Sequence, residues 1–213
     1  MKLCYVTDRK ALAGTADEQI RGLLEKIESC GRAGVDCIQV REKDLSGHAL
    51  SELTGEALRR APGSCRIVVN DRVDVALATG AAGVHLGEQS LPVSEARRFL
   101  REQKMEGKFL VGASAHSLES ALAAEEAGAD YVIYGPVFAT PSKARYGAPQ
   151  GLEKLKAVCQ RSRIPVIAIG GVMPANAREC VEAGAAGVAA IRLFQDTTDL
   201  PGVVRELRAA MGR

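Results

Sequence analysis

The sequence predicts one (β/α)8 barrel that spans residues 1–213 as a single domain, and three observations lead to this fold class. Short apolar runs alternate with longer helical patterns, a turn of small residues recurs four times, and no linker or low-complexity segment breaks the pattern. A chain of 213 residues with 46% hydrophobic and 25% charged residues suits a compact barrel with few insertions.

Eight short apolar runs are the expected strands, and most are almost continuously apolar, as is typical of parallel strands buried on both faces. They are Leu3–Thr7, Cys37–Val40, Arg66–Val69, Gly83–Leu86, Phe109–Ala113, Tyr131–Tyr134, Val166–Ile169 and Gly187–Ile191. Helical patterns between them indicate βαβ units. The clearest are Glu18–Cys30, Ala49–Arg60, Ser94–Glu102, Ser117–Glu126, Leu152–Gln160 and Ala175–Glu182.

A turn of small residues precedes every second expected strand. Its glycines, Gly34, Gly80, Gly128 and Gly184, stand 46, 48 and 56 residues apart, and glycine just past a helix end suits a left-handed C-cap. Four copies of a two-strand unit give the eight strands of a barrel. The alternative, an open doubly wound sheet, has no reason to repeat this turn four times.

The composition argues against several classes of protein. The formal net charge of +2 is too small to indicate a nucleic-acid or membrane-surface partner. No apolar run reaches the roughly 18 residues that span a bilayer, and Asp8 and Arg9 end the first run too early for a signal peptide. The six cysteines form no CxxC pair, which is typical of free thiols, so we expect a cytoplasmic protein.

The active site of such a barrel lies at the carboxyl ends of the strands, and polar residues follow all eight runs. After the seventh run, Gly170 and Gly171 predict one anion station, because two glycines let backbone N–H groups approach an oxyanion. Arg192, which follows Ile191 and the eighth run, would add charge there. A tight structural turn is the alternative for the two glycines.

Gln39, Arg41 and Lys43 predict a second anion station after the second run. In an extended segment they would point the same way, and Arg and Lys both suit phosphate oxygens. The alternative is a solvated loop in which Glu42, Lys43 and Asp44 neutralise one another.

Asn70 and Asp71 follow the third run and favour the binding interpretation of this station. Mg²⁺ prefers one or two carboxylates together with phosphate oxygens and water, so Asp71 is a candidate ligand. An ion pair of Asp71 with Arg72 or Arg41 is the alternative. Two anion stations imply two phosphorylated groups, on two substrates or at two ends of one. Catalytic triads, HExxH, P-loop and GxGxxG motifs do not occur in the sequence.

These motifs resemble those of the thiamine phosphate synthase family and its close relative, thiazole tautomerase, nearly end to end. The most specific are Gln39-Val-Arg41-Glu-Lys43, Asn70-Asp71-Arg72, Gly83-Val-His85-Leu-Gly87, Gly112-Ala-Ser114-Ala-His116, Gly135-Pro-Val-Phe-Ala-Thr140-Pro-Ser142-Lys143 and Ile169-Gly170-Gly171-Val. The resemblance implies that hydroxymethylpyrimidine diphosphate loses diphosphate and is attacked by the thiazole phosphate nitrogen. The stabilised methylene cation needs no protein nucleophile.

The resemblance also implies roles for individual residues. The diphosphate would be held by Gln39, Arg41, Lys43 and Asn70, and Mg²⁺ would be bound by Asp71. Lys143 would lie near the diphosphate, and Ser114 near the leaving-group oxygen. The residues implied for thiazole phosphate are Thr140, Ser142, Gly170 and Gly171. Ile191 and Arg192, at the end of the eighth run, are further candidates for substrate binding.

Three positions depart from the family pattern. A second Mg²⁺-binding Asp usually follows the glycine after the fourth strand, but Ser90 stands there, so Glu88, or Ser90 through a water, would complete the site. Arg192 replaces a phosphate-binding Ser, and Ser142 stands where Thr is common.

A thiazole tautomerase is the alternative function, since it needs neither diphosphate nor metal and would use His116 as a proton shuttle. Gln39, Lys43 and Asp71 favour the synthase, because a tautomerase has no evident need for a diphosphate clamp. A non-catalytic, regulatory thiazole-phosphate-binding protein is a further alternative. A homodimer is compatible with the sequence.

Overall fold

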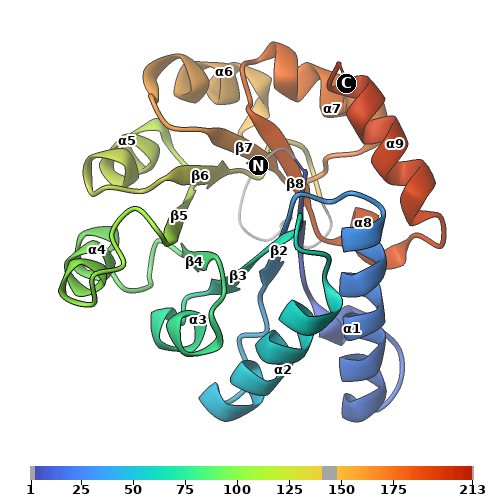
Figure 1. The fold of residues 1–213 in the computed structure, drawn as a ribbon. Helices are drawn as coiled ribbons and strands as arrows, with labels where there is room; N and C mark the ends of the chain where they lie inside the picture. Colours follow the sequence, from blue (N-terminus) through green and yellow to red (C-terminus); the bar gives the residue numbers. More distant parts are fainter. Residues whose placement is uncertain (1–2, 141–147, 213) are drawn as a thin grey trace.

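The structure, a computed structural model, describes residues 3–140 and 148–212. Eight parallel strands pair in sequence order and close into a barrel, with β8 beside β1 (Figure 1). The strands are β1 (Leu3–Val6), β2 (Cys37–Val40), β3 (Arg66–Asn70), β4 (Gly83–Leu86), β5 (Leu110–Ala115), β6 (Tyr131–Tyr134), β7 (Val166–Ile169) and β8 (Gly187–Ala190). The predicted (β/α)8 barrel is confirmed, and the open sheet is wrong.

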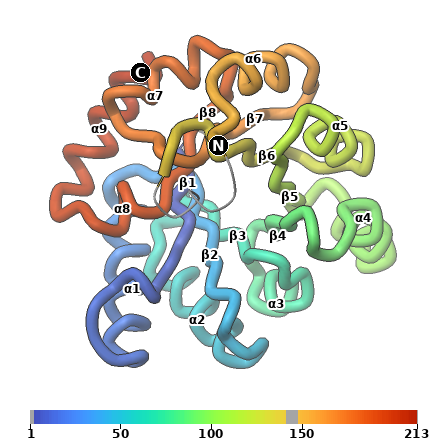
Figure 2. The backbone as a smooth tube through the Cα atoms, turned by 180° about the vertical axis from the view of Figure 1, so that it is seen from behind, coloured from blue at the N-terminus to red at the C-terminus, as the bar shows by residue number. Residues whose placement is uncertain are grey.

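The helices form a ring outside the strands, which Figure 2 shows from behind. They are η1 (Arg9–Ala11), α1 (Ala16–Arg32), α2 (Gly47–Arg60), α3 (Val73–Thr79), α4 (Val93–Glu102), α5 (Leu118–Glu126), α6 (Gly151–Arg161), α7 (Pro174–Glu182), α8 (Arg192–Asp196) and α9 (Leu200–Ala210). All six predicted helices are present, whereas η1, α3, α8 and α9 were not predicted. Helix α1 begins before the predicted Glu18 because Thr15 and Glu18 form a capping box.

The four repeated glycines all adopt left-handed backbone conformations, as the C-cap interpretation predicts. Their φ angles are +98° at Gly34, +74° at Gly80, +98° at Gly128 and +101° at Gly184. Each therefore ends a helix and returns the chain to the next strand. The repeat therefore has a structural role, because its turns lead the chain from a helix into the next strand of the barrel.

A cluster of apolar side chains fills the barrel interior and is separate from the larger core between strands and helices. Its buried members are Cys4, Val6, Cys37, Val68, Tyr131, Ile133, Ile167 and Ala189. Gly112 leaves room for the Tyr131 ring, since a Cβ there would lie 2.1 Å from Tyr131 Cζ. The barrel is therefore a packed core, and ligands can enter only at its rim.

All six cysteines are free, as predicted, and burial raises the pKa of the Cys30 and Cys65 thiols to about 12. Within residues 3–140 and 148–212, no helix is both long enough and apolar enough to cross a membrane.

Candidate active site at the carboxyl ends of the strands

A chain of polar contacts joins the ends of β2 and β3. Gln39 Nε2 donates to Asn70 Oδ1 at 2.7 Å, and Asn70 Nδ2 donates to Asp71 Oδ2 at 2.6 Å. The ammonium group of Lys43 lies 3.7 Å from Asp71 Oδ2. The structure thus brings together four residues that the sequence assigned to one station. The suggested ion pair of Asp71 with Arg72 is wrong, because Arg72 pairs with Asp74.

The predicted extended segment from Gln39 to Lys43 is only partly right. Strand β2 ends at Val40, and Lys43 lies in a turn with 58% of its side chain exposed. The solvated-loop alternative is also wrong, because Glu42 is buried and Asp44 pairs with Arg9. The turn brings Lys43 close to Asp71, so the alternation of side chains along an extended strand is not the reason for this contact.

Asp71 has a φ of +61°, a left-handed conformation that Asp tolerates better than most residues. Its Oδ1 accepts hydrogen bonds from the Ser90 hydroxyl and, at 3.1 Å, from the Gly87 N–H. Burial alone would raise the pKa of Asp71, but these hydrogen bonds and the charge of Lys43 outweigh it and hold the pKa below its ordinary value. Asp71 is therefore ionised at neutral pH, as a cation ligand must be.

Of the two residues suggested to complete the metal site, only Ser90 contacts Asp71. The Glu88 carboxylate instead binds His116, with Oε2 3.1 Å from Nδ1 and Oε1 accepting the backbone N–H at 3.1 Å. No group of three or more His, Cys, Asp or Glu that could hold a metal occurs in the described part of the chain. Any Mg²⁺ here would depend on Asp71, phosphate oxygens and water, which fits the preferences of Mg²⁺.

Ser114 lies inside β5, since that strand continues beyond the predicted Ala113 and pairs with β6 up to Ala115. His85 Nε2 lies 3.0 Å from Ser114 Oγ, and the His85 ring packs against Tyr131. Burial lowers the pKa of His85 to about 4, so the imidazole is neutral near pH 7. A neutral, buried ring thereby fixes the Ser114 hydroxyl at the rim, whereas His116 has 45% of its side chain exposed.

The double-glycine turn follows β7 and requires glycine at both positions. The φ angles are +96° at Gly170 and +66° at Gly171. A Cβ at Gly170 would lie 2.5 Å from Pro136 Cβ, and one at Gly171 would lie 2.7 Å from Ala139 O. The loop after β6 therefore packs directly on this turn, and Phe138 N donates to Gly170 O at 2.9 Å.

The candidates near this turn have different outcomes. Thr140 lies at the end of the described part of the β6 loop, whereas Ser142 and Lys143 lie outside the described residues. Arg192 begins α8 and pairs with Asp196 at 2.7 Å, with 66% of its side chain exposed. The charge expected from Arg192 is therefore largely neutralised, while Ile191 packs beside the interior cluster.

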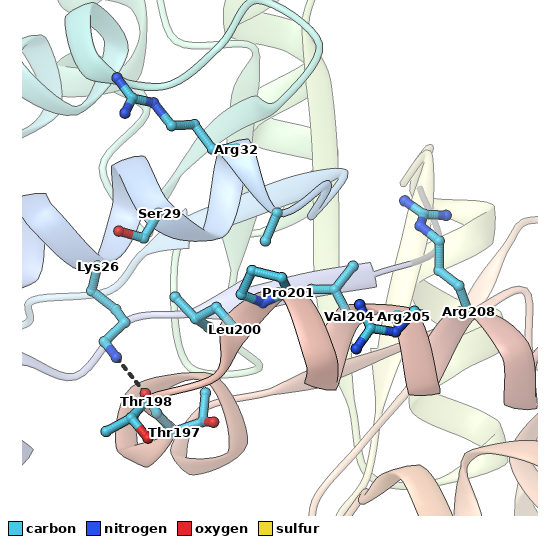
Figure 3. Close-up of a pocket in the computed structure, with 11 residues that line it drawn as sticks. Lys26, Ser29, Arg32, Thr197, Thr198, Leu200, Pro201, Val204, Arg205 and Arg208 are labelled. Carbon is cyan, nitrogen blue, oxygen red and sulfur yellow. Dashed lines mark hydrogen bonds between the residues drawn. The ribbon is translucent and has the colours of Figure 1, made fainter.

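A groove on the outer surface, between α1 and the α8–α9 segment, is also rich in basic residues (Figure 3). Most of its cations already have partners. Lys26 donates to Thr197 O at 2.9 Å, Arg32 pairs with Glu28, and Arg208 pairs with Asp36. The residues that line the groove belong to α1, to α9 and to the segments beside them, and none of them is a predicted site residue, so we do not assign it to the active site.

The fold and the polar strand ends define a class of protein, the (β/α)8-barrel enzymes that bind their ligands at the barrel rim. More narrowly, the chain belongs to the thiamine monophosphate synthase family, whose model matches residues 3–194. This match confirms the resemblance seen in the sequence.

Individual relatives agree with this assignment. A putative thiamine-phosphate synthase of Geobacter sulfurreducens is 45% identical over 89% of this chain and 84% of its own length. The thiamine-phosphate synthase of Chloroflexus aurantiacus is 39% identical over 98% and 95%. The structure of thiamine phosphate pyrophosphorylase from Pyrococcus furiosus superimposes with a TM-score of 0.81 at 33% identity, covering 99% of this chain and 95% of that one.

Proposed function

We propose that this chain is a Mg²⁺-dependent transferase that joins hydroxymethylpyrimidine diphosphate to thiazole phosphate and releases thiamine phosphate and diphosphate. Its family and the names of its relatives support the reaction. The observation that carries the proposal is the linked set Gln39, Asn70, Asp71 and Lys43, which places an ionised carboxylate beside a cation at one side of the rim. This pairing suits a metal-bound diphosphate and has no evident use in a tautomerase.

In the proposed reaction the methylene C–O bond breaks and its electron pair leaves with diphosphate. The thiazole nitrogen then donates its lone pair to form the new C–N bond. Lys43 and Arg41 would neutralise the departing charge, and Ser114, held by His85, would donate a hydrogen bond to the leaving oxygen. Mg²⁺, bound through Asp71, would supply further charge neutralisation.

Thiazole phosphate would bind across the rim, at the turn of Gly170 and Gly171. Both glycines have left-handed backbones, and without side chains their N–H groups would be able to approach an oxyanion closely. Thr140 would contribute its hydroxyl, as would Ser142, and Lys143 would reach towards the diphosphate. We also propose a cytoplasmic location, which the six free cysteines support, and assembly as a homodimer.

One contact favours the thiazole tautomerase as a second candidate function. His116 lies at the rim with its Nδ1 3.1 Å from Glu88, and a histidine oriented by a carboxylate is a suitable proton shuttle. A regulatory protein that binds thiazole phosphate without turnover is the third candidate.

One assay separates these candidates. The purified protein is incubated with hydroxymethylpyrimidine diphosphate, thiazole phosphate and Mg²⁺, and in parallel with the thiazole carboxylate phosphate tautomer alone. We expect thiamine phosphate and diphosphate in equal amounts in the first reaction. Isomerisation in the second reaction, without thiamine phosphate in the first, would favour the tautomerase, and binding without either product would favour the regulatory protein.

Ser90→Asp should lower the Mg²⁺ concentration that gives half the maximal rate. The substitution places a second carboxylate where the Ser90 hydroxyl now contacts Asp71, and Mg²⁺ accepts one or two carboxylates. Ser90→Ala is the matched control, because it removes the hydroxyl and adds no ligand. The same Mg²⁺ dependence in the wild type and Ser90→Asp would mean that water already fills this position.

A further inference from the structure

The carboxyl end of β1, taken together with the residues that follow it up to Arg9, lies between the two stations. This is because β1 pairs with β2 on one side and with β8 on the other. None of the residues predicted for the site comes from this strand. Its end nevertheless carries two buried side-chain networks, one directed to the β2 segment and one to α8.

The first network is built on Glu42, whose side chain is only 2% exposed although it stands between Arg41 and Lys43. Its carboxylate accepts hydrogen bonds from Thr7 Oγ1 at 2.6 Å and from the Arg9 guanidinium at 3.0 Å. The backbone N–H of Arg9 donates to the same carboxylate at 3.2 Å. A buried carboxylate is tolerated only with such partners, so the end of β1 fixes the position of Glu42.

The same network extends to the residues on either side of Glu42. Thr7 Oγ1 accepts the backbone N–H of Arg41 at 2.9 Å. Asp44 receives two hydrogen bonds from Arg9, at 2.6 and 2.7 Å, which hold the pKa of its carboxyl well below the usual range. The segment that carries Arg41 and Lys43 is therefore attached to β1 both before and after Lys43.

The second network is built on Gln195 of α8. Tyr5 Oη donates to Gln195 Oε1 at 2.6 Å, and Gln195 Nε2 donates to the backbone carbonyl of Asp8 at 2.9 Å. Tyr5 and Gln195 are both buried. Helix α8 has only five residues and no side-chain N-cap, and the two Gln195 hydrogen bonds attach it to Tyr5 and to the Asp8 carbonyl.

We propose that the end of β1 is a positioning element for both stations, with Glu42 orienting the diphosphate cations and Gln195 orienting the β8–α8 rim beside the double-glycine turn. Glu42, Thr7 and Gln195 are positioning residues, since each acts through other groups. The inference rests on the proposed function for the identity of the two ligands.

The test measures the two affinities separately by calorimetry, with Mg²⁺ plus inorganic diphosphate as one probe and thiazole phosphate as the other. Glu42→Gln should weaken diphosphate binding at least about tenfold and leave thiazole phosphate binding unchanged, because groups that orient ligating residues typically contribute this much. Gln195→Met, which keeps the volume and removes both hydrogen bonds, should weaken thiazole phosphate binding selectively. In turnover, each variant should raise KM for its own substrate more than it lowers kcat.

Two further variants keep the test decisive. Thr7→Val removes the hydrogen bonds to Glu42 and Arg41 and leaves every charge in place. It replaces Glu42→Gln in the test if that variant does not fold, and we expect the same loss of diphosphate binding. Glu28→Gln removes an ion-pair carboxylate on α1 and should change neither affinity. Equal losses for both probes, or no loss, would overturn the positioning role. Failure of the wild type to bind either probe would instead overturn the proposed function and the inference with it.

Discussion

Replacing Asp71 with asparagine should lower kcat about 100- to 1,000-fold, the range seen when one preorganised electrostatic group is removed from an active site. Asparagine preserves the shape of the side chain and tolerates the left-handed conformation, with its φ of +61°. The substitution removes the charge that Lys43 and a metal ion would share, and it replaces one of the two oxygens that accept hydrogen bonds from Asn70, Gly87 and Ser90 with an NH₂ group. The measurement is kcat over a range of Mg²⁺ concentrations, and we expect the loss to persist at saturating Mg²⁺.

Asp74→Asn is the matched control for this prediction. Asp74 lies three residues further along, on α3, and pairs with Arg72 at the surface. Surface ion pairs contribute little, so kcat should stay within about twofold of the wild type. If Asp71→Asn keeps the rate and the Mg²⁺ dependence of the wild type, Asp71 is not a ligand of Mg²⁺.

Gly171→Ala should raise KM for thiazole phosphate about tenfold or more and lower the free energy of unfolding by roughly 2 kcal/mol. A left-handed backbone costs a residue with a Cβ about 1–2 kcal/mol. The added Cβ would also lie 2.7 Å from both Ala139 O and Phe138 Cβ, so the β6 loop must move. Both the glycine amides and Thr140 would then leave the positions that we propose for phosphate binding.

Gly80→Ala separates the two effects. Gly80 has a similar φ of +74°, and an added Cβ there would meet nothing within 4 Å. This variant should lose stability by a comparable backbone cost and keep the KM of the wild type. If Gly171→Ala loses stability while its KM is unchanged, the turn is structural and the phosphate binds elsewhere.

The barrel is predicted well because its strands and turns are encoded by short apolar runs and glycines that are visible in the local sequence. The strands at Cys37–Val40, Gly83–Leu86, Tyr131–Tyr134 and Val166–Ile169 match the structure at both ends, and an arginine or a glycine directly follows each of these apolar runs. Strand β5 extends to Ala115 because pairing with β6 is a tertiary interaction. Helix α3, with seven residues and no side-chain cap, is too short for a clear helical pattern.

The site is predicted less completely, because side-chain partners depend on distances through space. The positions of Gln39, Asn70 and Asp71 at the ends of two adjacent strands were sufficient to predict that these side chains lie close together. The contact between Glu88 and His116 joins different loops and has no local signal. Arg192 and Asp196 are four residues apart on one helix, so their ion pair could have been anticipated.

Glu42 shows a different difficulty. In the sequence it is one of several charged residues in a row, and charged residues are usually exposed. Its burial follows from Thr7 and Arg9, which lie just after β1 and more than thirty residues earlier in the sequence. Glu42, which we propose as a positioning residue of the diphosphate station, therefore has no local signal in the sequence.

The central claim is that the barrel rim holds two separate anion stations, and simultaneous binding tests it most directly. Thiazole phosphate is titrated into the protein by calorimetry, first alone and then with saturating Mg²⁺ and inorganic diphosphate. We predict one thiazole phosphate per chain in both titrations, with an affinity that diphosphate does not weaken. Competitive displacement of thiazole phosphate by diphosphate would contradict the claim, because it would mean that both anions share one station.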